Sequence, residues 1–193
     1  MCGCYYLGDE DTEEDMAEIL EALNRRGALP ALRTSGVILP TDVVPVLAND
    51  RALRPTPFAM AWGYTLLGGK RIINARSETA AAKPLFADGM ARRRCLIPAK
   101  HYFEWEKRDG AKIKYAIRPS GSSRLWLAGL YRIEQGQPVF TILTRAPAAQ
   151  IAFIHDRMPV MLSQEAGDDW LNLSLSAERV LMGALLDVSF AAA

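Results

Sequence analysis

Residues 101–118, HYFEWEKRDGAKIKYAIR, contain two runs rich in aromatic and β-branched residues on either side of Asp109-Gly110. A two-residue turn of this type between such runs predicts a β-hairpin. Further strands are predicted outward from it at CLIPA (95–99), LWLAGLYRI (125–133) and PVFTILT (138–144). Connections of hairpin length outnumber helical crossovers in this half of the chain, so we expect a mainly antiparallel sheet.

The segments before this hairpin continue the β pattern. VILPTDVVPVL (37–47) is β-branched but interrupted by Pro40 and Pro45, which is typical of an edge strand or an extended loop. FAMAWGYTLL (58–67) and RIIN (71–74) predict two strands around Gly68 and Gly69.

Helices are predicted mainly near the two ends of the chain. From Thr12 to Arg26, apolar residues recur at spacings of three and four, which indicates an amphipathic helix with an acidic outer face. One short helix is predicted from Ala146 to Ile154. Two more are predicted at SQEAGDDWLNL (163–173) and SAERVLMGALL (176–186), the last with Ser176 as its N-cap. Helices outside a mainly antiparallel sheet define an α+β class, and 193 residues form one ordinary domain over 1–193.

Composition places the chain among soluble globular proteins. Half of the residues are hydrophobic and 23% are charged, no run approaches the roughly 18 apolar residues that a membrane span needs, and the N-terminus is acidic. The three cysteines are few and odd in number, so we expect free thiols and no disulfide framework. We therefore expect a cytoplasmic monomer with no membrane association.

The net charge of +1 averages over two unequal parts. Residues 9–21 hold eight acids and no base, whereas residues 22–160 hold 22 Lys and Arg against 9 Asp and Glu, an excess of 22 − 9 = 13 positive charges. Such an excess suits phosphate binding, and it equally suits a solvated surface, so charge alone leaves both interpretations open.

Cys2 directly follows Met1, and its small side chain favours removal of that methionine. Removal exposes an amine and a thiol on adjacent carbons, a pair that condenses with aldehydes to a five-membered thiazolidine. The alternative is an incidental cysteine at a frayed end. A zinc site built from the cysteines and a histidine (Cys2, Cys4, Cys95, His101, His155) lacks paired Cys-x-x-Cys spacing, so we expect no metal and no cofactor.

Four other residues could take part in chemistry. His155 lies where a predicted helix gives way to an apolar strand and could exchange protons near pH 7. Strand alternation points Glu104 to the same face as Tyr102, where burial would suit it to acid or base work. Asn74, at the end of a predicted strand, could orient a substrate oxygen, and Arg76 would point the same way. Each has an ordinary surface or turn role as its alternative.

Taken together, these residues lie in an ordered set of motifs: MCG (1–3), WG (62–63), NARSET (74–79), RRRCLIPA (92–99), YFEW (102–105), LWLAGLY (125–131), FTILT (140–144) and HDRMPVML (155–162). The set resembles the SRAP family, the SOS-response-associated peptidases that process abasic DNA. The resemblance implies one α+β domain with a barrel-like sheet flanked by helices and a channel for single-stranded DNA containing abasic sites.

The resemblance also implies roles for the candidate residues. Processed Cys2 would crosslink covalently to the ring-opened abasic aldehyde, Asn74 would hold the substrate or the cysteine backbone, and Glu104 would move protons. His155 would act on the sugar oxygen during ring opening and lyase-type strand scission. The residues expected to contact DNA are Arg76 and Arg157 at phosphates, and Trp105 and Trp62 at bases or sugar.

The chain departs from the family pattern at three places. Cys4 occupies the position where the family usually has arginine, VILPTD lacks the usual asparagine, and His101 with Lys100 replaces smaller or acidic neighbours and adds local positive charge. Two other functions stay open: a cysteine peptidase that removes its own Met1 with His155 as base, and a noncatalytic single-strand binding module.

Overall fold

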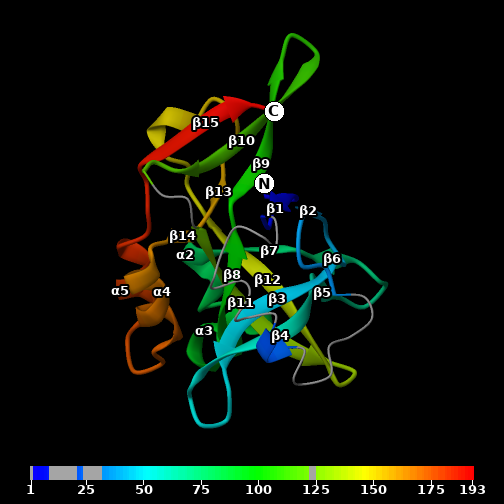
Figure 1. Cartoon of the computed structure of the whole chain (residues 1–193), viewed down its shortest axis with the longest axis vertical. Helices are drawn as coiled ribbons and strands as arrows, with labels where there is room; N and C mark the ends of the chain where they lie inside the picture. Colours follow the sequence, from blue (N-terminus) through cyan, green and yellow to red (C-terminus); the bar gives the residue numbers. More distant parts are fainter. Residues whose placement is uncertain (1, 9–20, 24–31, 122–124) are drawn as a thin grey trace.

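The computed structural model describes residues 2–8, 21–23, 32–121 and 125–193, arranged as a β-barrel with a second sheet above it and helices against its side (Figure 1). Of the acidic helix expected from Thr12 to Arg26, only residues 21–23 are described, and they are helical. The rest of that prediction lies outside the described residues. No helix in the described ranges is long and apolar enough to cross a membrane.

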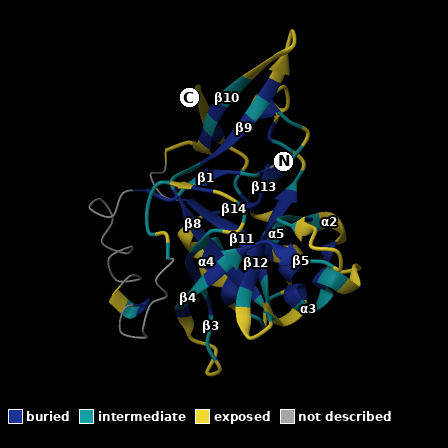
Figure 2. Cartoon of the chain, turned by 90° about the vertical axis from the view of Figure 1, so that its right-hand side faces the viewer, coloured by how far each residue is buried: buried dark blue, intermediate teal, exposed yellow. Residues whose placement is uncertain are grey.

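Five strands close the barrel in the order β3-β4-β12-β11-β8 and back to β3. They are β3 (Val43–Asn49), β4 (Pro55–Trp62), β8 (Arg94–Ala99), β11 (Leu125–Glu134) and β12 (Gln137–Arg145). All neighbouring pairs are antiparallel except β4 with β12. Figure 2 shows these strands largely buried, because their inward side chains form the centre of the hydrophobic core.

The second sheet has the order β15-β10-β9-β1-β2. Its strands are β1 (Tyr5–Tyr6), β2 (Val37–Ile38), β9 (His101–Arg108), β10 (Ala111–Pro119) and β15 (Val188–Ala192). Only Lys100 separates β8 of the barrel from β9, so the chain passes directly from one sheet into the other. The β9–β10 hairpin projects beyond the body, with the described N-terminal segment beside its base (Figure 1).

Short elements complete the structure. The remaining strands are β5 (Tyr64–Thr65), β6 (Arg71–Ile72), β7 (Asn74–Arg76), β13 (Met158–Pro159) and β14 (Met161–Leu162). The described helices are α2 (Ser77–Ala80), α3 (Pro84–Arg92), α4 (Gln164–Leu171), α5 (Ala177–Met182) and the 3₁₀ turn η2 (Ala149–Ile151). The expected α+β class and barrel-like sheet are therefore confirmed.

Three local predictions are corrected by the structure. The segment expected as an edge strand or an extended loop contains β3, a strand of the barrel wall that pairs with β4 on one side and β8 on the other. Pro45 is tolerated because β3 pairs with β8 only at Leu47 and Ala48. The helix expected over Ala146–Ile154 is reduced to η2. Pro147 has no backbone N–H to donate, and the hydrogen bonds that form join residues three apart, as Ile151 N and Ala148 O do. Ser176 occupies the N-cap of α5 but its side chain makes no capping hydrogen bond.

Gly129 on β11 faces a crowded part of the barrel. A Cβ there would lie 2.5 Å from Ile97 Cδ1 and 3.0 Å from both Cys95 Sγ and the Thr141 carbonyl oxygen. We expect Gly129→Ala to lower the free energy of unfolding in urea by about 1–3 kcal/mol, because that carbonyl belongs to a paired strand and cannot move freely. Gly183→Ala is the control, since its Cβ would meet only Val180 O at 3.5 Å; equal stability losses in both variants would contradict the packing argument.

Candidate functional site

Cys2 is fully buried between the barrel and the second sheet rather than frayed. Asn74 Nδ2 donates a hydrogen bond to the Cys2 carbonyl oxygen at 2.7 Å. Asn74 is the first residue of β7, which lies parallel to β12 with Asn74 opposite Ile142, so the barrel wall fixes its position. The Cys2 backbone is therefore held by a side chain 72 residues away in the sequence.

Glu104 approaches Cys2 from the second sheet. β1 pairs with β9 so that Tyr5 lies opposite Tyr102, and Phe103 N donates to Cys4 O at 2.9 Å just beyond that pair. The Glu104 side chain is buried. Its negative charge contributes, after burial, to the raised pKa of the Cys2 thiol. Of the two orientations that the sequence left open for Glu104, buried or facing solvent, the structure has the buried one.

The Cys2 thiol is not readily ionised in this chain. Burial first, and then the negative charge of Glu104, raise its pKa to about 12, against a smaller lowering by the Cys4 backbone N–H. This pKa applies to the chain that still carries Met1, whereas the activated aminothiol predicted from the sequence is that of Cys2 after Met1 is removed. At neutral pH the sulfur carries its proton, and a reaction through it needs a nearby group to take that proton away.

Two tyrosines complete the surroundings of Cys2. Burial and the neighbouring Cys2 raise the pKa of both Tyr5 and Tyr102. Among the described residues, neither hydroxyl oxygen has a hydrogen-bond partner, and Asn74 Oδ1 has none either. A buried polar atom without a hydrogen-bond partner lowers the free energy of unfolding by about 1–3 kcal/mol. A polar ligand that forms hydrogen bonds with these three atoms would remove that cost. Alternation along β9 indicated Tyr102, whereas nothing in the sequence indicated Tyr5.

His155 lies in the turn before β13 and is partly exposed. Its Nδ1 accepts a hydrogen bond from Arg157 N at 3.0 Å and lies 2.7 Å from Asp156 Oδ1. Both contacts are made through Nδ1 and hold the ring in the turn. Within the described ranges no hydrogen bond joins His155 to Cys2, Asn74 or Glu104.

Strand pairing nevertheless places the His155 turn near Asn74. β13 pairs with the end of β12, where Thr144 lies opposite Pro159, and β7 pairs with the same stretch of β12, where Thr144 lies opposite Arg76. Arg76 is exposed and forms no ion pair with any described residue. Its guanidinium is therefore available to an anion.

Arg157 is already engaged within the protein. Its guanidinium donates to both carboxylate oxygens of Glu78 at 2.8 Å and to Thr144 O at 2.6 Å. The hydrogen bonds from Arg157 lower the pKa of Glu78 to about 2. A phosphate would have to displace Glu78 to reach this arginine, and the sequence did not indicate the pair.

The two candidate tryptophans differ in exposure. Trp62 is fully buried, donates from Nε1 to Ile73 O at 2.9 Å and stacks on Phe140 with ring centroids 6.2 Å apart. The structure therefore corrects the expectation that Trp62 meets bases or sugar, because its indole is fully buried between Phe140 of the barrel and Tyr5 of the second sheet. Trp105 on β9 is only partly buried, beside Lys114 of β10.

Comparison with known proteins identifies the family of this chain. A family model described as SOS response associated peptidase (SRAP) matches residues 1–190. The chain belongs to the SRAP family. Two of its SRAP relatives in Bacillus subtilis are named abasic site processing proteins. YoqW is 40% identical over 185 residues, covering 89% of this chain and 80% of that protein, and YoaM is 38% identical over 124 residues.

The YoaM match spans 61% of this SRAP chain and about half of YoaM itself, 55%. Among solved structures, a phage-related protein of Bordetella bronchiseptica superposes with a TM-score of 0.77 at 22% identity, covering 100% of this chain and 94% of that one. At this identity the likeness concerns the fold alone.

Proposed function

We propose that this SRAP protein processes abasic sites in single-stranded DNA by forming a covalent thiazolidine between Cys2, once Met1 has been removed, and the ring-opened sugar aldehyde. The observation that carries the proposal is the enclosure of Cys2, with Asn74 on its carbonyl and Glu104 near its thiol. The names of the B. subtilis relatives support the same substrate.

The first steps join the amine to the sugar. His155 takes the proton of the anomeric hydroxyl and passes it to the ring oxygen as the bond between that oxygen and the anomeric carbon breaks, which gives the aldehyde. Glu104 takes one proton from the Cys2 ammonium group, and the free amine attacks the aldehyde carbon to give a carbinolamine. Glu104 then returns that proton to the carbinolamine hydroxyl, which leaves as water, and an iminium remains. The amine reacts first, because only a nitrogen can form the iminium that the sulfur then attacks.

The next step closes the ring. Glu104 accepts the thiol proton as the sulfur attacks the iminium carbon, so one aldehyde, one amine and one thiol yield one thiazolidine and one water. Strand scission starts from the same iminium: loss of a proton from the adjacent sugar carbon expels the 3′ phosphate with its bonding electrons. Unpaired Arg76 lies at the end of β7 and would hold a flanking phosphate.

The test is adduct formation with an oligonucleotide that bears one abasic site. Wild-type protein, shown by intact mass to lack Met1, is expected to give an adduct that survives denaturing electrophoresis, whereas Cys2→Ala gives none. Cys4→Ala is the matched control, because Cys4 is also buried and lies two residues away, and it should retain the adduct. An adduct with Cys2→Ala, or none with processed wild type, would refute the proposal.

A further inference from the structure

Two buried tyrosines, Tyr5 and Tyr102, lie beside the reaction centre in the second sheet. They are directly opposite each other in β1 and β9, so their rings share one face, and Glu104 joins that face two residues farther along β9. Tyr5 is 0% and Tyr102 1% exposed. In the mechanism above, only Glu104 of these three residues takes part.

The Tyr102 hydroxyl is the one that shares its surroundings with both Cys2 and Glu104. Burial first, and then the negative charges of Cys2 and Glu104, raise the pKa of Tyr102, so this hydroxyl keeps its proton at neutral pH. For Tyr5, the charge that follows Cys2 in raising the pKa is that of Asp42, next to the barrel strand β3. Tyr102 is therefore the donor nearest to the acid–base group.

Within the described part of the chain, the Tyr102 hydroxyl oxygen is buried without a hydrogen-bond partner. The neighbouring His101 does not serve it, because alternation turns that ring to the other face, where it stacks on Tyr6 with centroids 5.0 Å apart. Burial, followed by the positive charges of three neighbouring basic residues, lowers the pKa of His101. Its ring is thus uncharged at neutral pH, which corrects the expectation that His101 adds positive charge.

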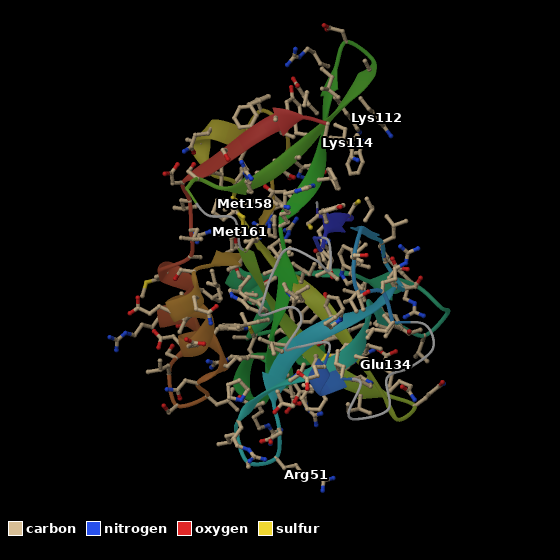
Figure 3. All side chains as sticks on the ribbon, viewed as in Figure 1. Arg51, Lys112, Lys114, Glu134, Met158 and Met161 are labelled. Carbon is tan, nitrogen blue, oxygen red and sulfur yellow. The ribbon has the colours of Figure 1, made fainter. Side chains whose placement is uncertain are left out.

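The two lysines of β10 also lie away from Tyr102. Lys112 and Lys114 alternate with Tyr115, whose partner in β9 is Glu104, so the lysines occupy the opposite face of the hairpin. Their side chains lie beside each other there (Figure 3). An oxygen that gains negative charge beside Glu104 meets neither lysine, and the sheet offers it a neutral donor, Tyr102 Oη.

We propose that Tyr102 is a further catalytic residue, whose hydroxyl donates a hydrogen bond to the aldehyde oxygen while the Cys2 amine attacks. The nitrogen lone pair forms the new bond to carbon, and one carbon–oxygen bond breaks with its electrons moving onto the oxygen. That oxygen then takes the proton that the nitrogen gives up and becomes the carbinolamine hydroxyl, and Tyr102 keeps its own proton. A donor fixed in a site without water stabilises such an oxygen better than water does.

This role rests on the proposed function, which supplies the aldehyde. The test compares Tyr102→Phe with Tyr115→Phe, since each change removes one hydroxyl and keeps the buried ring. Tyr115 is the matched control because it lies on the same face, but its hydroxyl already donates to Glu106 Oε2 at 3.0 Å. Two quantities are measured for each variant: the single-turnover rate of adduct formation on an abasic oligonucleotide, and the urea midpoint of the free protein.

The two variants are expected to show opposite effects. Tyr102→Phe should slow adduct formation by about 10²-fold, because one donor to the developing oxyanion is lost. Its urea midpoint should equal or exceed that of wild type, because the missing hydroxyl had no partner. Tyr115→Phe should lower the midpoint, because Glu106 loses a hydrogen bond, and should react within a few-fold of the wild-type rate.

A wild-type rate in Tyr102→Phe would overturn the role of this hydroxyl. A midpoint of Tyr102→Phe as low as that of Tyr115→Phe would also overturn it, since the hydroxyl would then have a structural partner. Absence of any adduct with wild type would refute the proposed function as well, whereas a normal wild-type adduct with an unaffected Tyr102→Phe would refute only the role of Tyr102.

Discussion

Replacing Glu104 by glutamine is expected to slow formation of the covalent adduct by about 10²–10⁴-fold, the range typical of losing a general acid–base group. The Cys2 thiol is buried and its pKa is raised to about 12, so it needs a neighbour that accepts its proton. Glu104 is the carboxylate whose charge that thiol feels. Glutamine keeps the size and hydrogen-bonding capacity of the side chain but cannot take the proton.

Glu106→Gln is the matched control for this experiment. Glu106 lies two residues farther along the same strand and on the same face, but its carboxylate is occupied by Arg108 and Tyr115. Single-turnover rates of adduct formation should therefore stay within a few-fold of wild type. If Glu104→Gln reacts as fast as wild type, or if both variants are equally slow, the assigned role of Glu104 is wrong.

Keeping any residue before Cys2 is expected to abolish the stable adduct altogether. An amide nitrogen does not condense with an aldehyde, so a chain extended ahead of Cys2 presents only a thiol, and the five-membered ring cannot close. A protein with an N-terminal tag should give no denaturation-resistant product, and proteolytic release of Cys2 should restore it. A C-terminally tagged protein, measured in parallel, controls for the tag itself.

The peptidase alternative, in which the chain removes its own Met1, is tested by a separate experiment. If the chain removes its own Met1, Glu104→Ala protein made without host aminopeptidase should retain Met1 in its intact mass, whereas wild type should lose it.

For the N-terminally tagged protein, crosslinking without release of Cys2 would contradict the requirement for a free amine.

The sequence predicts the local parts of this fold well. The β9–β10 hairpin forms as expected because Asp109 and Gly110, with φ of 51° and 80°, form a turn that adjacent residues alone specify. Closure of the barrel depends on β3 meeting β8 and on β4 lying parallel to β12, and neither contact leaves a local pattern. The helices α2 and α3 and the strand β15 were also not predicted.

The candidate site shows the same division. The motifs indicate Cys2, Asn74 and Glu104, and the alternation of side chains along the strand places Glu104 on the same face as Tyr102. The full burial of Trp62 and the ion pair between Arg157 and Glu78, 79 residues apart, depend on how distant segments pack. Residue spacing carries no information on such contacts, so exposure and charge pairing had to come from the structure.

The most direct test of the central claim is the chemical identity of the bond to DNA. Adduct formed by processed wild type on an abasic oligonucleotide would be digested and mapped by tandem mass spectrometry, with and without borohydride. The account predicts a sugar remnant on Cys2 with loss of one water, no reduction by borohydride and a Cys2 sulfur closed to alkylation. A remnant on a lysine, or a Cys2 sulfur that still alkylates, would contradict it.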